Sequence, residues 1–169
     1  MEDLPELQGD KFKGRPSRAR YDAVYHELDR KFRRMQPTAD RLMRHIVDAL
    51  WDQFGNNPYS WCGFYTLQPD GEALILGAHR DKPACSPLPM HGVCGQVAKS
   101  GKAMNVPDVK ALGEAHIVCD PRNVSELCLP VYNKDQKLFA VFDVDSTQPN
   151  AFDEMDQRWL ERILKHFSK

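Results

Sequence analysis

The sequence predicts an α+β fold in which a central antiparallel β-sheet is flanked by helices from both ends of the chain. Three observations lead to this prediction. Two amphipathic stretches come first, strand-like runs joined by short turns fill the middle, and another amphipathic stretch comes last. Strands joined by hairpins pair antiparallel, and helices grouped at the ends of the chain can cover such a sheet. The 169 residues suffice for one domain with a buried core.

Apolar residues at three- and four-residue steps predict the helices, because this spacing places them on one helical face. Such stripes occupy residues 21–35, 42–54 and 152–167. A short helix is also expected over residues 92–100, where Gly101 supplies a typical helix end.

β-prone runs bounded by turn residues predict the strands. The first two runs form a hairpin around Pro69-Asp70-Gly71, and the last two form a hairpin around residues 133–136. Long stretches without periodicity separate the other runs and are expected to be loops. The strands are expected at residues 60–67, 73–76, 103–106, 125–132 and 138–145, and the loops at residues 77–88 and 107–121.

The composition excludes several classes of protein. With 23 basic and 24 acidic residues, the chain has no electrostatic signature for binding nucleic acid or an anionic membrane. It also has no apolar run near the roughly 20 residues that a membrane helix needs. Residues 1–18 are polar and read as a flexible arm before a domain at residues 19–169, and they lack the apolar segment of a secretory signal. We therefore expect a cytoplasmic protein.

Five cysteines are an odd number for a chain without an export signal, so a structural disulfide framework is not expected. Cys62 and Cys128 lie inside apolar strand runs, where a free cysteine behaves as a small buried hydrophobic residue. Cys85, Cys94 and Cys119 lie in or beside loops, which is where reactive groups are usually presented.

The neighbours of Cys119 do not decide whether it is reactive. His116 would lower the pKa of the thiol if it were protonated, while Asp120 would raise it. Nitrogen and sulfur ligands for zinc are present, but none shows a CxxC or HxxxH spacing, so no metal site is expected. These candidate ligands are His79, Cys85, His91, Cys94, His116 and Cys119.

Asp143 and Asp145 end an apolar strand run, and side chains two apart in a strand point to the same face. The pattern alone favours a solvated entry to a turn. If the pair faces a pocket instead, one acid can keep a raised pKa and donate a proton while the other binds an ammonium group. Glu126, on the preceding strand, is a third acid that the hairpin could bring close.

Seven short motifs follow one another along the chain and include all three loop cysteines. Together they make residues 21–167 similar to the free methionine-(R)-sulfoxide reductases, which are catalytic GAF domains. The motifs are Trp61-Cys62-Gly63-Phe64-Tyr65, Lys82-Pro83-Ala84-Cys85, Gly92-Val93-Cys94-Gly95, Pro107-Asp108-Val109, His116-Ile117-Val118-Cys119-Asp120, Ser125-Glu126 and Phe142-Asp143-Val144-Asp145-Ser146.

The resemblance implies a GAF-like fold and a role for each candidate residue. Cys119 would be the nucleophile, with Cys85 as the first choice of resolving cysteine and Cys94 as the alternative. Trp61 and Tyr65 would form the wall around the methylthio group of the substrate. Three acids would contact the substrate, and one of them would protonate the sulfoxide oxygen: Glu126, Asp143 and Asp145.

The resemblance also implies the partners of the reaction. Attack by Cys119 would leave a sulfenic acid, which a second thiol would convert to a disulfide. Thioredoxin, supplied with electrons from NADPH by thioredoxin reductase, would reduce this disulfide, and no bound cofactor would be needed. A homodimer is also implied. The main alternative is a GAF domain that senses a small ligand without catalysis.

Overall fold

The computed structural model describes residues 16–81 and 83–169. The expected flexible arm, residues 1–18, falls almost entirely on residues 1–15, which lie outside the described residues. None of the described helices is both long and apolar enough to cross a membrane. The elements, in chain order, are α2 (Arg18–Lys31), α3 (Ala39–Phe54), β1 (Trp61–Leu67), β2 (Ala73–Arg80), β3 (Leu88–Pro89), α4 (Val93–Ser100), β4 (Met104–Val106), the 3₁₀ helix η1 (Val109–Ala115), β5 (Ser125–Tyr132), β6 (Leu138–Ser146), α5 (Glu154–Leu164) and the 3₁₀ helix η2 (Lys165–Ser168).

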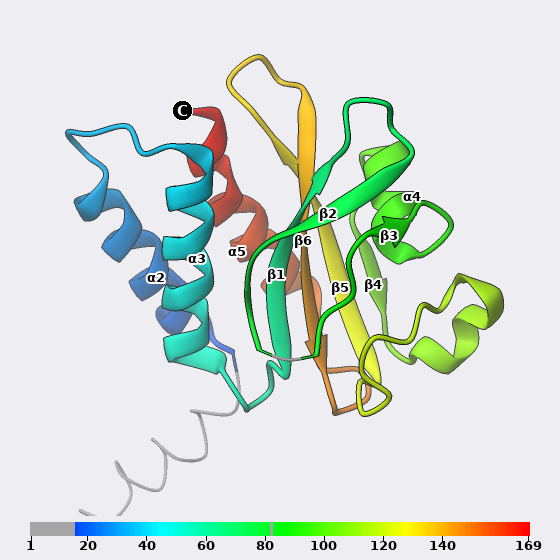
Figure 1. The fold of residues 1–169 in the computed structure, drawn as a ribbon. Coiled ribbons are helices and arrows are strands. Elements are labelled where there is room, and N and C mark those ends of the chain that lie inside the picture. Colours follow the sequence, from blue (N-terminus) through cyan, green and yellow to red (C-terminus); the bar gives the residue numbers. More distant parts are fainter. Residues whose placement is uncertain (1–15, 82) are drawn as a thin grey trace, which may run out of the picture.

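The six strands form one sheet in the order β3-β2-β1-β6-β5-β4, and every neighbouring pair is antiparallel. Helices α2, α3 and α5 lie on one side of this sheet, while α4 and the η1 segment lie on the other (Figure 1). The predicted α+β architecture, with an antiparallel sheet between helices from both ends of the chain, is therefore confirmed.

The two faces of the sheet have separate apolar clusters, because successive side chains in a strand point to opposite faces. On β1, Cys62 and Phe64 face the cluster under α2, α3 and α5. Trp61 and Tyr65 face the cluster under α4. The second cluster also contains Cys128 and Cys94, so α4 and the sheet enclose the region where most candidate site residues lie.

The helices begin and end where capping chemistry allows. The side chains of Ser17 and Thr38 accept hydrogen bonds from backbone N–H groups in the first turns of α2 and α3. Gly101 ends α4 with φ of 70°, a conformation that costs glycine little, and its N–H donates to the carbonyl of Val97.

Several details of the sequence prediction are wrong. The 3₁₀ helix η1 (Val109–Ala115) lies within residues 107–121, which were expected to be a loop. Strand β2 continues to Arg80, whereas residues 77–88 were expected to be a loop. Its backbone stays paired with β1 as far as Cys62↔Arg80, and this pairing does not require a side-chain pattern. Met35 was placed on the apolar stripe of the first helix, but it lies beyond the end of α2 and is 55% exposed.

A buried carboxyl group ties α5 to α2. Asp156 is 2% exposed and accepts hydrogen bonds from the hydroxyl of Tyr21 at 2.6 Å and from the backbone N–H of Asp153 at 2.9 Å. Burial raises the pKa of Asp156 from 3.8 to about 6. Between pH 3.8 and about pH 6, Asp156 is therefore mostly protonated in the folded protein but mostly ionised in the unfolded chain.

This raised pKa predicts a measurable pH dependence of stability. Asp156 contributes fully to the free energy of unfolding when the pH is below its pKa in the unfolded chain. This contribution is lost as the pH rises through its pKa in the folded protein. Asp156→Asn cannot titrate, so the stability of the wild type relative to this variant should fall by about 2–3 kcal/mol between roughly pH 4 and pH 8. Urea unfolding of both proteins measures the difference, and a difference that does not change with pH would contradict the prediction.

Candidate active site

Strand pairing brings the predicted acids and aromatic residues to one face of the sheet. Asp145 on β6 lies opposite Trp61 on β1 and opposite Glu126 on β5. Two residues earlier on β6, Asp143 lies opposite Gly63 on β1. The carboxylates of Asp143, Asp145 and Glu126 approach one another within 4.8 Å. The hairpin therefore gathers the three acids as their spacing predicted.

A cavity of about 60 Å³ lies between this face, the N-terminal end of α4 and the two loops that carry Cys85 and Cys119. Its lining includes the three acids, Trp61, Tyr65 and Cys119. Asp143 and Asp145 thus border a cavity, and the solvated turn that their pattern favoured is wrong. Asp143 is only 5% exposed, because α4 and the loops cover the strand end.

Cys85 and Cys119 form a disulfide bond between these two loops, with a Cα–Cα distance of 5.5 Å. Both residues are partly buried, and Cys119 lines the cavity. The hydroxyl of Tyr65 donates a hydrogen bond to the backbone carbonyl of Cys85 at 2.9 Å, which connects β1 to this loop. Cys119, the predicted nucleophile, is therefore bonded to Cys85, the predicted resolving cysteine, beside the three acids.

Burial and mutual repulsion favour the protonated forms of the central acids. The pKa of Asp143 is raised well above its ordinary value, first by burial and then by the charge of Asp145. The pKa of Asp145 is also raised, by burial and by the neighbouring charge of Glu126. A cation in the cavity would relieve this repulsion, and a protonated carboxyl group could serve as a proton donor.

Two polar atoms at the cavity lack hydrogen-bond partners within the described part of the chain. They are Nε1 of Trp61 and Oδ1 of Asp143, and both are buried. Gly63 lets the indole lie there, since a Cβ at this position would be 2.6 Å from the ring of Trp61. Unpaired buried polar atoms cost free energy, so this donor and this acceptor indicate a place for a polar ligand.

Cys94 has a different neighbour from the other two loop cysteines. It lines the cavity, but its sulfur contacts the sulfur of Cys128 at 3.5 Å. The hydrogen bond with Cys128 and burial both raise the pKa of the Cys94 thiol. Burial raises the pKa of Cys128 to about 12. Cys62 and Cys128 are buried, as expected for residues inside apolar strands.

The charged neighbours of Cys119 are also placed. Asp120 is paired with Arg122 at 2.7 Å, and the hydrogen bonds from Arg122 lower the pKa of the Asp120 carboxyl group. His116 lines the cavity. The six residues considered as zinc ligands do not gather into one group within the range that the structure describes, but Cys94 does join another possible set of ligands.

Three features of the site were not predicted from the sequence. Gly63 makes room for the indole, and Asn123 lines the cavity and accepts a hydrogen bond from the hydroxyl of Ser60. Cys128 shares the cavity face of the sheet with Glu126. The two-residue spacing between Glu126 and Cys128 on one strand was a signal that could have revealed this.

Comparisons with known proteins agree on one domain family. The pattern of the GAF domain family matches residues 36–169. GAF domain-containing protein A of Dictyostelium discoideum is 36% identical over 124 residues, which are 73% of this chain and 75% of that protein. The free methionine-R-sulfoxide reductase of Saccharomyces cerevisiae is 37% identical over 112 residues, or 65% of this chain and 62% of that enzyme.

Solved structures show the same similarity over a longer part of the chain. A reduced form of fRMsr from Staphylococcus aureus has a TM-score of 0.79 at 28% identity, covering 90% of this chain and 94% of that one. The free methionine-R-sulfoxide reductase of Neisseria meningitidis, solved with its substrate, also has a TM-score of 0.79, at 27% identity and 90% coverage of each chain. The resemblance drawn from the sequence motifs is thus confirmed.

Proposed function

The chain belongs to the GAF domain family, and from its cavity we propose that it reduces free L-methionine-(R)-sulfoxide to L-methionine, with Cys119 as the nucleophile. The observation that carries this proposal is the Cys85–Cys119 disulfide at a cavity bordered by three carboxyl groups. The named reductases among its relatives support the same reaction. A sensor needs no such pair of thiols, so the disulfide favours the enzyme over the non-catalytic alternative.

The acids explain why the substrate would be a free amino acid. Glu126, Asp143 and Asp145 offer clustered carboxylate oxygens, which suit the ammonium group of an amino acid. A methionine sulfoxide residue within a polypeptide has no such amine. The stacked rings of Trp61 and Tyr65, with centroids 5.9 Å apart, form an apolar wall for the methylthio end.

The proposed reaction begins when the Cys119 thiolate attacks the sulfoxide sulfur. A protonated acid, from Glu126 or one of the aspartates, gives its proton to the sulfoxide oxygen. The attack forms a bond between the sulfur of Cys119 and the sulfur of the substrate. This bond and the S–O bond of the substrate break as the protonated oxygen moves to Cys119, which becomes a sulfenic acid, and methionine leaves with its sulfur reduced by two electrons. The Cys85 thiol then attacks the sulfenic sulfur, which forms the disulfide and releases water.

Thioredoxin is the proposed reductant that restores the two thiols. Exchange requires a thiolate of the reductant to reach one sulfur of the disulfide, and both cysteines are only partly buried. NADPH would supply the electrons through thioredoxin reductase, so the protein itself would use no bound cofactor. This cycle fits a cytoplasmic protein, because the cytosol keeps thiols reduced.

Separated R and S epimers of free methionine sulfoxide test the proposal. In an assay coupled to thioredoxin and thioredoxin reductase, we expect NADPH consumption with the R epimer only. An N-acetylated, amide-capped R epimer should be a poor substrate, because it lacks the ammonium group. Equal turnover of both epimers would contradict the stereochemical claim, and no turnover of either would favour the sensor.

The two candidate resolving cysteines can be separated by substitution. We expect Cys85→Ser to form methionine once but to accumulate the Cys119 sulfenic acid, because the partner in the disulfide is missing. Cys94→Ser is the matched control and should still form the Cys85–Cys119 bond. Intact mass after one equivalent of substrate, with a sulfenic acid trap, measures both outcomes. Loss of the disulfide in Cys94→Ser alone would assign resolution to Cys94.

A further inference from the structure

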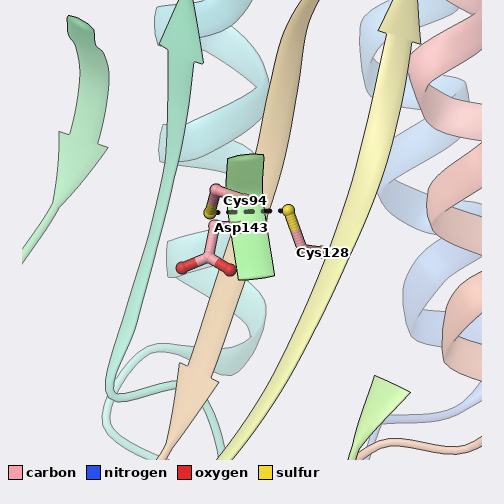
Figure 2. A group of neighbouring side chains, drawn as sticks. All are labelled: Cys94, Cys128 and Asp143. Carbon is pink, nitrogen blue, oxygen red and sulfur yellow. Dashed lines mark hydrogen bonds between the residues drawn. The ribbon is translucent and has the colours of Figure 1, made fainter. Parts of the chain in front are cut away.

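Beneath the cavity, three side chains with metal-binding atoms meet in a buried group. Cys128 on β5 and Asp143 on β6 are directly opposite each other in the sheet, and Cys94 lies in the first turn of α4 above them (Figure 2). Their exposed fractions are 0%, 5% and 6% respectively. One ligand atom from each lies within 4.8 Å of the other two.

The spacing of these atoms resembles one face of a tetrahedral metal site. A tetrahedral Zn²⁺ with Zn–S bonds of about 2.3 Å holds its two sulfurs about 3.8 Å apart. The sulfurs of Cys94 and Cys128 are 3.5 Å apart, so a small movement would suffice. Together with the oxygen of Asp143, they provide the three protein ligands of an open zinc site.

A second feature of Asp143 also indicates a ligand at this place. Oδ1 of Asp143 is buried and has no hydrogen-bond partner among the described residues. Cys94 and Asp143 both line the cavity, whereas Cys128 lies behind them. An ion could therefore enter through the cavity and take its fourth ligand from there.

We propose that Cys94, Cys128 and Asp143 form a binding site for a thiophilic cation, with Zn²⁺ as the ion that fits best. Two thiolates and one carboxylate in a tetrahedral arrangement favour Zn²⁺ over the oxygen-preferring Mg²⁺ and Ca²⁺. The set differs from the zinc ligands considered from the sequence, which did not include Cys128 or Asp143. Strand pairing brings Cys128 and Asp143 together, the packing of α4 adds Cys94, and no short sequence motif identifies the group.

Occupation of the site would have a consequence for the reductase. Asp143 also belongs to the acids proposed to bind the substrate ammonium group, and one carboxylate cannot serve both partners fully. Zn²⁺ would then inhibit the reaction. This consequence rests on the proposed function, whereas metal binding itself does not, and the test below measures binding alone.

The test uses the full chain with Cys85→Ser and Cys119→Ser, so that the two thiols of the redox pair cannot bind metal. Under a phosphine reductant, titration with Co²⁺ should give one ion per chain and a thiolate-to-cobalt charge-transfer absorption in the near ultraviolet. Zn²⁺ should displace Co²⁺ and remove the absorption. Adding Cys128→Ala should weaken Zn²⁺ binding by about a hundredfold or more, because losing a ligand exceeds the effect of losing an outer-shell contact.

Cys62→Ala is the matched control, since Cys62 is an equally buried strand thiol on the opposite face of the sheet. It should bind Co²⁺ and Zn²⁺ as the parent does. Asp143→Asn provides a second variant if Cys128→Ala does not fold, and it should weaken Zn²⁺ binding while keeping the charge-transfer absorption. Absence of that absorption in the parent, or equal affinity in the parent and Cys128→Ala, would overturn the proposal.

Discussion

Replacing Cys119 with serine is expected to lower kcat/KM for free methionine-(R)-sulfoxide by at least about a thousandfold. A serine hydroxyl is not ionised near neutral pH, and it cannot take up the sulfoxide oxygen and then form a disulfide. Cys119 lines the cavity and is bonded to Cys85 in the oxidised protein. The measurement is NADPH consumption with saturating thioredoxin, and formation of methionine when dithiothreitol is the reductant.

Two further measurements make this result specific to Cys119. Cys62→Ala removes a free thiol buried in the other apolar cluster and should keep turnover within about twofold of the wild type. Calorimetry should show that Cys119→Ser still binds the R epimer, because the acids and the aromatic wall remain. Substantial turnover by Cys119→Ser with either reductant would remove this residue from the mechanism.

Asp143→Asn is expected to lower kcat/KM by about a hundredfold without destabilising the fold above neutral pH. The loss of activity follows from removing a buried carboxylate that would pair with the substrate ammonium group, a change that typically costs about 2–5 kcal/mol. The same substitution that lowers activity is expected to stabilise the fold relative to the wild type as the pH rises. Burial and Asp145 raise the pKa of Asp143 in the folded protein, so its contribution is lost as the pH rises through that pKa.

A neutral amide avoids this loss, so the wild type should lose stability relative to Asp143→Asn between pH 5 and pH 8. Urea unfolding at both pH values and kcat/KM at pH 7.5 measure the two effects. Asp135→Asn, on the exposed loop between β5 and β6, is the matched control and should change neither. Full activity of Asp143→Asn, or a fold less stable than the wild type at pH 8, would contradict this account.

The sequence contains enough information to predict that the three acids lie on one face of the sheet. The two-residue step from Asp143 to Asp145 and the hairpin of β5 and β6 correctly predicted that Glu126 joins these two acids on one face. The sequence could not predict that Asp143 is buried, because an Asp-x-Asp pattern at a strand end is the same whether or not a helix covers that end. Coverage by α4 depends on tertiary packing, which no local pattern records.

The partners of the cysteines were equally hidden from local patterns. Cys85, Cys94 and Cys119 all lie in or beside loops, and sequence spacing does not determine which sulfurs meet. In the structure the loops join Cys85 to Cys119, while α4 directs Cys94 towards Cys128. Cys128 itself was correctly expected to be buried, but its contact with Asp143 arises from strand register.

A single-turnover experiment shows whether the Cys85 and Cys119 thiols supply the electrons that reduce the sulfoxide. The reduced protein is mixed with one equivalent of free methionine-(R)-sulfoxide in the absence of any other reductant. Methionine is then quantified, and the disulfide is located by peptide mass. We expect one methionine per chain together with a bond between Cys85 and Cys119. Recovery of unchanged sulfoxide with all five thiols still free would contradict it.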